Sequence, residues 1–217
     1  MDPRAYRGCE WNSTGSFRIA RCVLHLVLAT RNSHKTREFA DILGPGFHVT
    51  DLRGSSDVPS VEETGTTFEE NAVLKAVTAS RALATLVVAD DSGLEVEALD
   101  DAPGIRSARY AGQGATDQDN IAKLLRDLRG ARDRGAHFSC VIAMACRGEV
   151  KGIFQGRVSG SIALRPQGNE GFGYDPLFIP TGFTQSFGEL GAEQKNQISH
   201  RAVAIARFRF YLARRGG

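Results

Sequence analysis

Short apolar runs alternate along this chain with segments of helical spacing, and this alternation limits the possible folds more than any other feature. Residues 23–29 and 86–89 are rich in Val and Leu and stop at polar residues, as buried strands do. Residues 35–43 and 68–84 carry apolar side chains at helical spacing. The first half of the chain therefore predicts strands that alternate with helices.

A second pattern follows in the C-terminal half, where two apolar runs lie close together. Residues 138–146 and 150–155 flank the short turn Arg147-Gly148-Glu149, which predicts an antiparallel hairpin. The remaining expected elements are strands at residues 47–52, 94–98, 158–164 and 177–179, a helix at 117–128 capped by Thr116, a capping box of Thr67 and Glu70, and a last helix from the Ser199 cap to about residue 213. Together these elements predict an α/β fold around a mixed sheet.

Size and composition predict an ordinary globular protein. A chain of 217 residues with 41% hydrophobic and 24% charged residues can bury a substantial core, and we expect one domain at residues 23–214. The formal net charge of +2 gives no field that would favour nucleic acid or a membrane as a partner. The four cysteines lack the spacing of a zinc site or a disulfide framework, which predicts a reducing, cytoplasmic location. They are Cys9, Cys22, Cys140 and Cys146.

Residues 1–22 show neither helical nor strand periodicity, and we expect them to form a disordered extension. A secretory signal is the alternative, since Arg18 and Arg21 precede an apolar run at residues 22–29. That run is interrupted by His25, lacks a small-residue cleavage site after it, and is far shorter than the ~20 apolar residues of a membrane span. A translation start placed too far upstream would also account for this leader.

An acidic turn at residues 90–93, with the sequence Asp-Asp-Ser-Gly, directly follows an apolar strand. The end of a strand is where α/β proteins usually keep their sites. The adjacent carboxylates of Asp90 and Asp91 repel each other unless a cation offsets them, and Mg²⁺ does so while it bridges to phosphate. Glu63, or its neighbour Glu62, is the expected second ligand. The sequence thus predicts a metal and water site here, with a solvated acidic turn as the alternative.

A polar loop joins the first expected strand to the first expected helix, where free amides and the positive end of the helix favour phosphate. Its residues are Thr30, Arg31, Asn32, Ser33, His34 and Lys35. The paired glycines of a Walker motif are absent, so a capped surface turn is the alternative. On the helix at residues 68–84, Lys75 lies one turn after Asn71, so both could face a phosphate. A solvated surface lysine is the alternative there.

A glycine-rich loop at residues 171–176 and the start of the last helix offer a place for a base. The loop contains Phe172, Gly173, Tyr174 and Asp175. Its glycines let the backbone approach a ligand, its aromatic rings can stack on a base, and its carboxylate can accept from ring N–H groups. His200 can stack or donate, and Arg201 can donate to a purine 6-oxo group or to phosphate. Each segment alone fits an ordinary turn or helix start. Together, the acidic turn, the polar loop, Lys75, the glycine-rich loop and the start of the last helix suit one anionic nucleotide.

These motifs resemble the inosine/xanthosine triphosphate pyrophosphatase family, whose members clear deaminated purines from the nucleotide pool. The resemblance covers residues 23–212 and rests on segments 28–35, 62–65, 68–72 with Lys75, 89–94, 103–110, 171–176 and 199–201. It implies an elongated, two-lobed α/β fold with the active-site cleft between the lobes, a homodimer and dependence on Mg²⁺. It also implies hydrolysis of dITP, ITP and XTP to monophosphate and pyrophosphate, which keeps these nucleotides out of DNA and RNA.

The resemblance also implies roles for individual positions. Glu63 and Asp91 bind the metal, and Asp91 is the general base. The phosphate-binding set is Thr30, Arg31, Asn32, Ser33, His34, Lys35, Lys75, Ser92 and Lys195, and the base-holding set is Phe172, Gly173, Tyr174, Asp175, His200 and Arg201. Many relatives have glycine where this chain has Arg31 or His34. His tolerates positive φ better than most residues, so the loop can keep its shape.

The chemistry expected of such a site is hydrolysis without a covalent intermediate. A water oriented by Asp91 attacks the α-phosphorus while metal and lysines neutralise the phosphates, and pyrophosphate leaves. Donors that meet the purine O6 would be left facing an amino group if adenine entered, which costs affinity. Guanine shares O6, so its 2-amino group must meet an unfavourable wall that the sequence does not locate.

Three other functions compete with this interpretation. The first is the same chemistry on a modified pyrimidine or on an ordinary nucleoside triphosphate, which a substrate panel would separate. The second is a nucleotide-binding regulator without catalysis, against which the presence of both Glu63 and Asp91 argues. The third is a nucleic-acid-binding module, which would need a basic stripe with exposed aromatics, and the arginines of the last helix are too few and dispersed for that.

Overall fold

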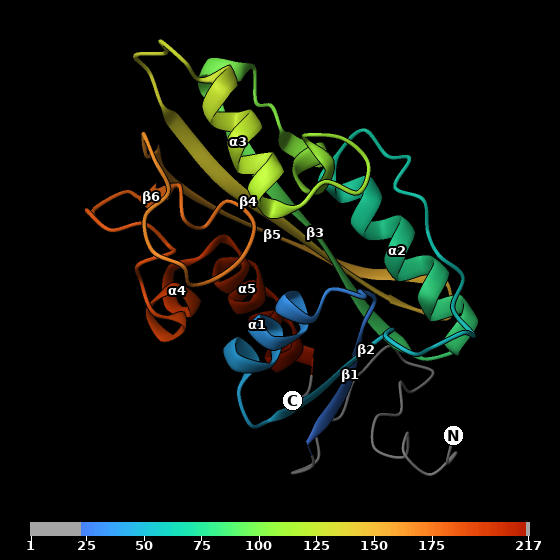
Figure 1. Ribbon diagram of the computed structural model, residues 1–217. Coiled ribbons are helices and arrows are strands. Elements are labelled where there is room, and N and C mark those ends of the chain that lie inside the picture. Colours follow the sequence, from blue (N-terminus) through green and yellow to red (C-terminus); the bar gives the residue numbers. More distant parts are fainter. Residues whose placement is uncertain (1–22, 216–217) are drawn as a thin grey trace.

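The computed structural model describes residues 23–215, which form a six-stranded sheet flanked by helices (Figure 1). The strands are β1 (Leu24–Leu28), β2 (Phe47–Asp51), β3 (Leu86–Val96), β4 (Gly135–Cys146), β5 (Glu149–Ile162) and β6 (Phe178–Pro180). The helices are α1 (Ser33–Leu43), α2 (Phe68–Leu83), α3 (Asp117–Asp127), α4 (Ala192–Ile198) and α5 (His200–Arg215), with 3₁₀ turns η2 (Glu97–Leu99) and η3 (Gly104–Arg109). The strand order is β2-β1-β3-β4-β5-β6, with β1 parallel to β2 and β3 and the other pairs antiparallel. The predicted α/β fold with a mixed sheet is confirmed.

The two faces of the sheet carry different helices, because successive residues of a strand point to opposite sides. Even-numbered residues of β3 and β4 pack with α1 and α5 in one core cluster, and they include Val88, Cys140, Ile142 and Met144. Odd-numbered residues pack against α2 in a second cluster, and they include Val87, Ala89, Val141 and Ala143. Figure 1 shows α2 on one side of the long strands and α1, α4 and α5 on the other. Each residue of β3 therefore faces one of two separate environments.

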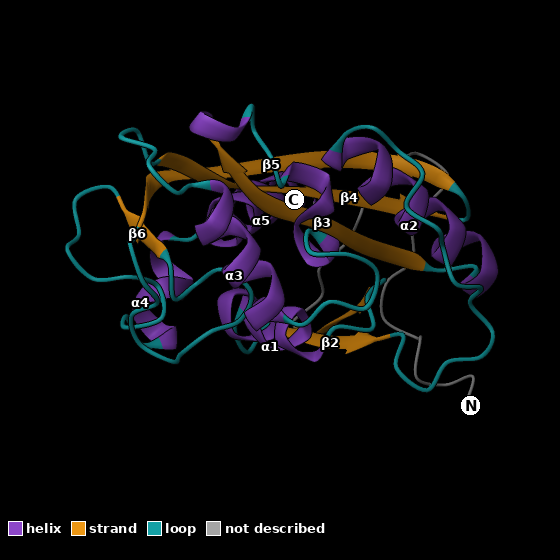
Figure 2. Ribbon diagram, turned by 45° about the horizontal axis from the view of Figure 1, so that its top comes forward, coloured by secondary structure: helices purple, strands orange, loops and turns teal. Residues whose placement is uncertain are grey.

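Past the middle of β3, a third core cluster continues the even-numbered face. Leu94 and Phe138 pack there with Leu124 of α3 and Phe178 of β6. The short edge strands β2 and β6 lie far apart, while β3, β4 and β5 run through the length of the molecule (Figure 2). The expected cleft between two lobes stays a prediction.

The predicted hairpin is confirmed as β4 and β5. Arg147 and Gly148 connect the strands and both have positive φ, 51° and 83°, as a two-residue turn of type I′ requires. β5 is longer than expected, since it continues without a break to Ile162 and absorbs most of the separate strand predicted at residues 158–164. Gly156 and Arg157, which separate the two expected strands, pair with Cys140 and Ser139 of β4 in the continuous ladder, and glycine is needed at residue 156 because a Cβ would lie 2.1 Å from His200 O.

The predicted acidic turn at residues 90–93 is wrong, because these residues lie inside one continuous strand, β3. Asp90 and Asp91 pair with Ile142 and Val141 of β4 in the regular antiparallel register. The expected separate strand at residues 94–98 is the end of the same strand, followed by η2. Two carboxylates remain within a strand here because cationic side chains meet them on both faces, which sequence alone does not show.

Helix starts agree with the sequence in most places. Thr116 and Asp119 form a complete capping box at α3, and the Ser199 hydroxyl accepts from Ala202 N at the start of α5. At α2 only half of the expected box forms: the Thr67 hydroxyl accepts from Glu70 N, but the Glu70 carboxylate bonds to Thr66. The short helix α4 was not expected, and α5 continues to Arg215.

Several expectations concern residues outside the part of the chain that the structure describes. The extension at residues 1–22 and the thiols Cys9 and Cys22 lie there. Within residues 23–215, Cys140 is buried, Cys146 is half-buried, and both are free thiols. No helix in this part combines the length and the apolar character that crossing a membrane requires.

Candidate active site

The centre of the candidate site is the middle of β3, where two neighbouring carboxylates point to opposite faces of the sheet. Asp90 faces α1 and α5, and Asp91 faces α2. The two residues are 2% and 6% exposed. The alternative of a solvated acidic turn is therefore wrong.

Asp90 is surrounded by cations. Its Oδ1 lies 2.9 Å from Lys35 Nζ, and its Oδ2 lies 3.0 Å from Arg201 Nη2 and accepts from Ser92 Oγ at 3.1 Å. Burial opposes ionisation, but the attraction of Lys35, Arg201 and Lys75 outweighs it and holds the pKa of Asp90 far below its ordinary range. Asp90 is thus a permanent anion that fixes the cations around it.

Asp91 has the opposite electrostatic balance. Its Oδ1 accepts from Lys75 Nζ at 2.7 Å, and the same ammonium donates to Glu63 Oε1 at 3.1 Å and to Asp90 O at 2.7 Å. Burial raises the pKa of Asp91 above its ordinary value, although Lys75 and Lys35 oppose the rise. Its Oδ2 is buried without a hydrogen-bond partner among the described residues. A buried carboxylate oxygen of this kind is available to a water or a cation.

Glu63 completes the group on the α2 face. Its Oε2 lies 2.9 Å from Arg109 Nη1, and although burial opposes ionisation, Lys75 and Arg109 lower the pKa of Glu63. Its neighbour Glu62 is exposed, which identifies Glu63 as the carboxylate that faces the site. The alternative of a solvated Lys75 is wrong, since its side chain is only 15% exposed and has three oxygen partners.

The residues present fit a divalent cation with few protein ligands. Glu63 and Asp91 converge on one point, the Lys75 ammonium, and Asp91 Oδ2 has no partner. Within residues 23–215, no group of three or more His, Cys, Asp or Glu side chains could hold a metal ion. Mg²⁺ fits two carboxylates, because it usually keeps several waters and completes its coordination with substrate phosphate.

The polar loop at residues 30–35, which we call the phosphate loop, leads into and forms the start of α1. Asn32 is its N-cap: the side-chain oxygen accepts from His34 N and Lys35 N, at 2.9 and 3.3 Å. The Thr30 hydroxyl accepts from Asn32 N at 3.1 Å, and Arg31 Nη2 donates to the backbone oxygen of residue 58. The loop is therefore a capped turn, as the alternative stated, and it also aims Lys35 at the centre of the site.

A series of buried ion pairs links Asp90 to the glycine-rich loop at residues 171–176, which we call the base loop. Arg201, only 1% exposed, pairs with Asp90 and with Glu38 of α1. Lys195 of α4, 3% exposed, lies 2.5 Å from Glu38 Oε1 and 2.6 Å from Asp175 Oδ2. Charges of alternating sign satisfy one another, so each is paired. Glu38 is not among the predicted site residues, although it lies one helical turn after Lys35 and shares its face of α1.

The base loop touches the phosphate loop directly. The ring of Phe172 stacks on His34, with centroids 5.3 Å apart, and Lys195 Nζ lies 4.9 Å from the same ring. Tyr174 differs from the expectation of a stacking face, because its ring is buried in the third core cluster and its hydroxyl donates to Ser107 O. A Cβ at Gly171 would lie 2.1 Å from Asp175 Oδ2, so this close approach requires glycine.

His200 lies behind the base loop. Its ring stacks on Phe138, with centroids 4.7 Å apart and planes inclined by 14°. Burial and the nearby cations Arg201 and Lys195 hold the pKa of His200 well below its ordinary value, so the ring is neutral at neutral pH. Its Nδ1 is buried without a hydrogen-bond partner among residues 23–215.

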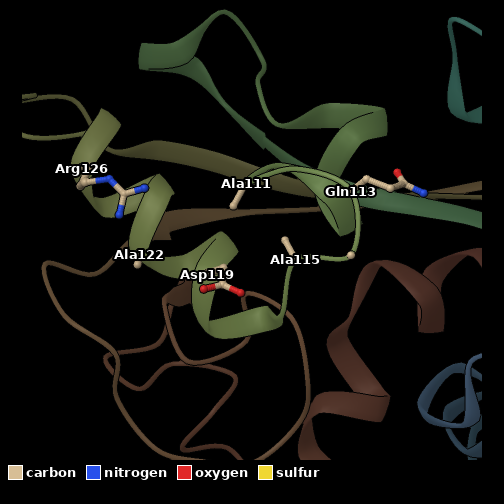
Figure 3. A pocket seen from close by; sticks show the side chains of 7 residues that line it. Ala111, Gln113, Ala115, Asp119, Ala122 and Arg126 are labelled. Carbon is tan, nitrogen blue, oxygen red and sulfur yellow. The ribbon is translucent and has the colours of Figure 1, made fainter.

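Two other hollows lie apart from these residues. Figure 3 shows one of about 420 Å³ beside α3, lined among others by Ala111, Gln113, Ala115, Asp119, Ala122 and Arg126. A groove of about 670 Å³ runs from the start of α2 along β4 and β5, past Phe68, Ser139 and Arg157. Neither is lined by any of the predicted site residues, so the expected nucleotide site is distinct from both.

Comparisons with known proteins identify the family of this chain. The family model described as the Ham1 family matches residues 26–211. A dITP/XTP pyrophosphatase of Geobacillus kaustophilus is 49% identical over 185 residues, which cover 84% of this chain and 91% of that protein. Among solved structures, the Ham1 protein of Staphylococcus aureus is 47% identical with a TM-score of 0.78, covering 87% of this chain and 98% of that one. A HAM1 protein from Coxiella burnetii is 41% identical with a TM-score of 0.79, covering 88% and 99%. The chain belongs to the Ham1 family.

Proposed function

We propose that this protein hydrolyses deaminated purine nucleoside triphosphates, namely dITP, ITP and XTP, to the monophosphate and pyrophosphate. The observation that carries the proposal is the environment of Asp91: a buried carboxylate of raised pKa, with one oxygen on Lys75 beside Glu63 and the other without a partner. The name of the relatives, dITP/XTP pyrophosphatase, supports the substrate class.

In the proposed reaction, the Asp91 carboxylate accepts a proton from a water and orients the oxygen of that water toward the α-phosphorus. The new P–O bond forms as the bond between the α-phosphorus and its bridging oxygen breaks, and pyrophosphate leaves. Lys75 and Lys35 balance the negative charge on the phosphates. Glu63 and Asp91 would hold Mg²⁺, which when bound neutralises the phosphate oxygens and lowers the pKa of water.

Base selection is proposed for the segments that meet at Phe172 and Arg201. The Phe172 ring is half-buried between His34 and Lys195, so a base would stack at the junction of the two loops. The Arg201 guanidinium carbon lies 5.9 Å from the Phe172 ring, and Arg201 and the neutral His200 are the donors proposed to meet the base. Donors that meet O6 leave an adenine amino group unmatched, which disfavours ATP.

A substrate panel tests the proposal. Pyrophosphate and orthophosphate release would be measured separately for ITP, dITP, XTP, ATP, GTP and a modified pyrimidine triphosphate, with Mg²⁺ and with a chelator. We expect pyrophosphate release from the three deaminated purines, dependent on Mg²⁺. Orthophosphate release would indicate γ-cleavage and a different enzyme, and preference for another base would favour the competing substrate class.

We further propose that the protein acts in the cytoplasm as a homodimer. Support for the location comes from Cys140 and Cys146, which are free thiols, and from the nucleotide substrate. Support for the dimer comes from the resemblance alone. Light scattering after size-exclusion chromatography measures the mass in solution, and a value of one chain mass would contradict the dimer.

A further inference from the structure

Glu63 lies in a segment without regular secondary structure, so helix or strand hydrogen bonds do not fix its backbone. It belongs to the irregular segment between β2 and α2, so its carboxylate is oriented by side-chain partners. Lys75 holds Oε1 but divides its donors among Glu63, Asp91 and Asp90 O. Arg109 holds Oε2 at 2.9 Å and contacts no other carboxylate among the described residues. Arg109 is thus the partner that is specific to Glu63.

Asn120 fixes the backbone on both sides of Arg109. This residue of α3 is 3% exposed, and its Oδ1 accepts from Ala111 N at 2.8 Å while its Nδ2 donates to Ala108 O at 3.2 Å. A single side-chain amide therefore brackets the two residues Arg109 and Tyr110. The side chain of Asn120 itself does not touch Glu63, Asp91 or Lys75.

Ser107, two residues before Arg109, connects the segment at residues 107–111 to β3. Its Oγ accepts from Leu94 N at 2.9 Å, and its backbone oxygen accepts from the Tyr174 hydroxyl at 2.9 Å. A Cβ at Gly93 would lie 2.4 Å from both Ser107 Oγ and Gly104 O, so η3 packs directly on the strand that carries Asp91. Arg109 is therefore presented at a fixed distance from Asp91.

We propose that Arg109 is a positioning residue that holds Glu63 toward Asp91 as a metal ligand, and that Asn120 acts through Arg109. This inference rests on the proposed function, because it takes Glu63 and Asp91 as the metal ligands. Residues that orient a ligand typically change metal affinity by about 10–100-fold when they are replaced.

The sign of the effect separates positioning from simple charge. Arg109 is a cation beside the site, so on Coulomb's law alone its removal would strengthen the binding of a divalent cation. If Arg109 instead orients Glu63, its removal releases the carboxylate into an irregular segment and binding weakens. The two explanations therefore predict opposite changes in metal affinity.

Mn²⁺ is the probe, because it suits carboxylate and water ligands and is followed directly by electron paramagnetic resonance without nucleotide. We expect Arg109→Gln to weaken Mn²⁺ binding about 10-fold and to lower kcat by a similar factor. Nucleotide affinity measured with a chelator present should stay unchanged. Arg109→Lys, which keeps the charge and a donor but lacks the guanidinium fork, should recover part of the loss.

Arg106→Gln is the matched control. Arg106 lies on the same η3 turn and its exposed side chain makes no hydrogen bond or ion pair among residues 23–215. Arg106→Gln removes the same charge from the same turn without removing a partner of Glu63, so Mn²⁺ affinity should stay at the value of the unaltered protein. Melting temperatures of all variants report whether the fold is intact.

Asn120→Ala tests the second half of the proposal. Alone it should weaken Mn²⁺ binding by less than Arg109→Gln does, because Arg109 remains but its backbone is no longer bracketed. In the Arg109→Gln background it should have no further effect on Mn²⁺ affinity, whereas independent effects would add. Additive effects would overturn the claim that Asn120 acts through Arg109.

The possible failures are distinguishable. Equal or stronger Mn²⁺ binding by Arg109→Gln would overturn the positioning role and leave the proposed hydrolysis intact. A loss confined to nucleotide affinity would assign Arg109 to the substrate and overturn it as well. If the unaltered protein bound no Mn²⁺ yet released pyrophosphate, the metal site itself and the role of Arg109 would both fall.

Discussion

Asp90 and Asp91 are adjacent in one strand, yet the two faces of the sheet give them opposite roles. On the α1 and α5 face, Lys35 and Arg201 meet Asp90 and lower its pKa. On the α2 face, burial exceeds the effect of Lys75, raises the pKa of Asp91 and leaves Oδ2 without a partner among the described residues. Both oxygens of Asp90 have cationic or hydrogen-bond partners, so this carboxylate holds the surrounding cations in place. Asp91 keeps one oxygen without a partner, so it can take part in the reaction.

Replacing Asp91 has the largest expected effect on turnover. Asp91→Asn keeps the shape of the side chain but removes the base and a metal ligand, so kcat should fall by about 10²–10⁴-fold. Nucleotide should still bind, because Lys75, Lys35 and the base loop are unchanged. Steady-state kinetics with equilibrium binding measures both quantities, and near-normal turnover would remove Asp91 from the role of base.

Replacing Asp90 should act on stability instead. Asp90→Asn leaves the half-buried Lys35 without its anion and the buried Arg201 with Glu38 alone, and breaking a buried pair costs about 3–5 kcal/mol. Urea unfolding measures this loss. Because the pKa of Asp90 is lowered in the folded state, its contribution is present above the ordinary value of 3.8 and is lost as pH falls below that value. An unchanged unfolding free energy would contradict the proposed division of roles.

The metal ligand can be tested with a matched pair of neighbours. Glu63→Gln removes the carboxylate that faces Asp91, so the Mg²⁺ concentration needed for half-maximal turnover should rise by about 10–100-fold. Glu62→Gln makes the same chemical change at an exposed side chain, and its Mg²⁺ requirement should match that of the unaltered protein. Equal effects of the two changes would remove Glu63 from the site.

The smallest expected effect belongs to Ser92. Its hydroxyl donates to Asp90 Oδ2 and accepts from Arg201 Nη2 at 2.9 Å, on the face of β3 that packs against α1 and α5. Ser92→Ala should therefore reduce the unfolding free energy by about 1 kcal/mol. The resemblance implies a phosphate contact for the same residue. A raised KM with unchanged unfolding would place Ser92 with the substrate instead.

Some of the fold and the site could be predicted because the cause is local. The hairpin of β4 and β5 follows from the short turn Arg147-Gly148-Glu149 between two apolar runs, of which Arg147 and Gly148 connect the strands. The start of α3 follows from Thr116 and Asp119, whose bonds span a single helical turn. Such patterns depend on neighbours in the chain, so they appear in the sequence.

Other features could not be predicted because their cause is distant in the chain. Arg201 reaches Asp90 across 111 positions, and Arg109 reaches Glu63 across 46. These contacts turn a sequence typical of a solvated turn into part of a buried strand. Glu38 could not be predicted for the same reason, since its partners Lys195 and Arg201 come from the far end of the chain.

The sequence by itself determined the alternation of strands and helices, the segments that carry the chemistry, and the presence of Glu63, Asp91 and Lys75. Only the tertiary structure decided that Asp90 and Asp91 face different environments. The physical reason is that a strand turns successive side chains to opposite sides, and the charge state of each then depends on the helices packed there. The order of residues places the two carboxylates together, and the packing of α1, α2 and α5 separates their functions.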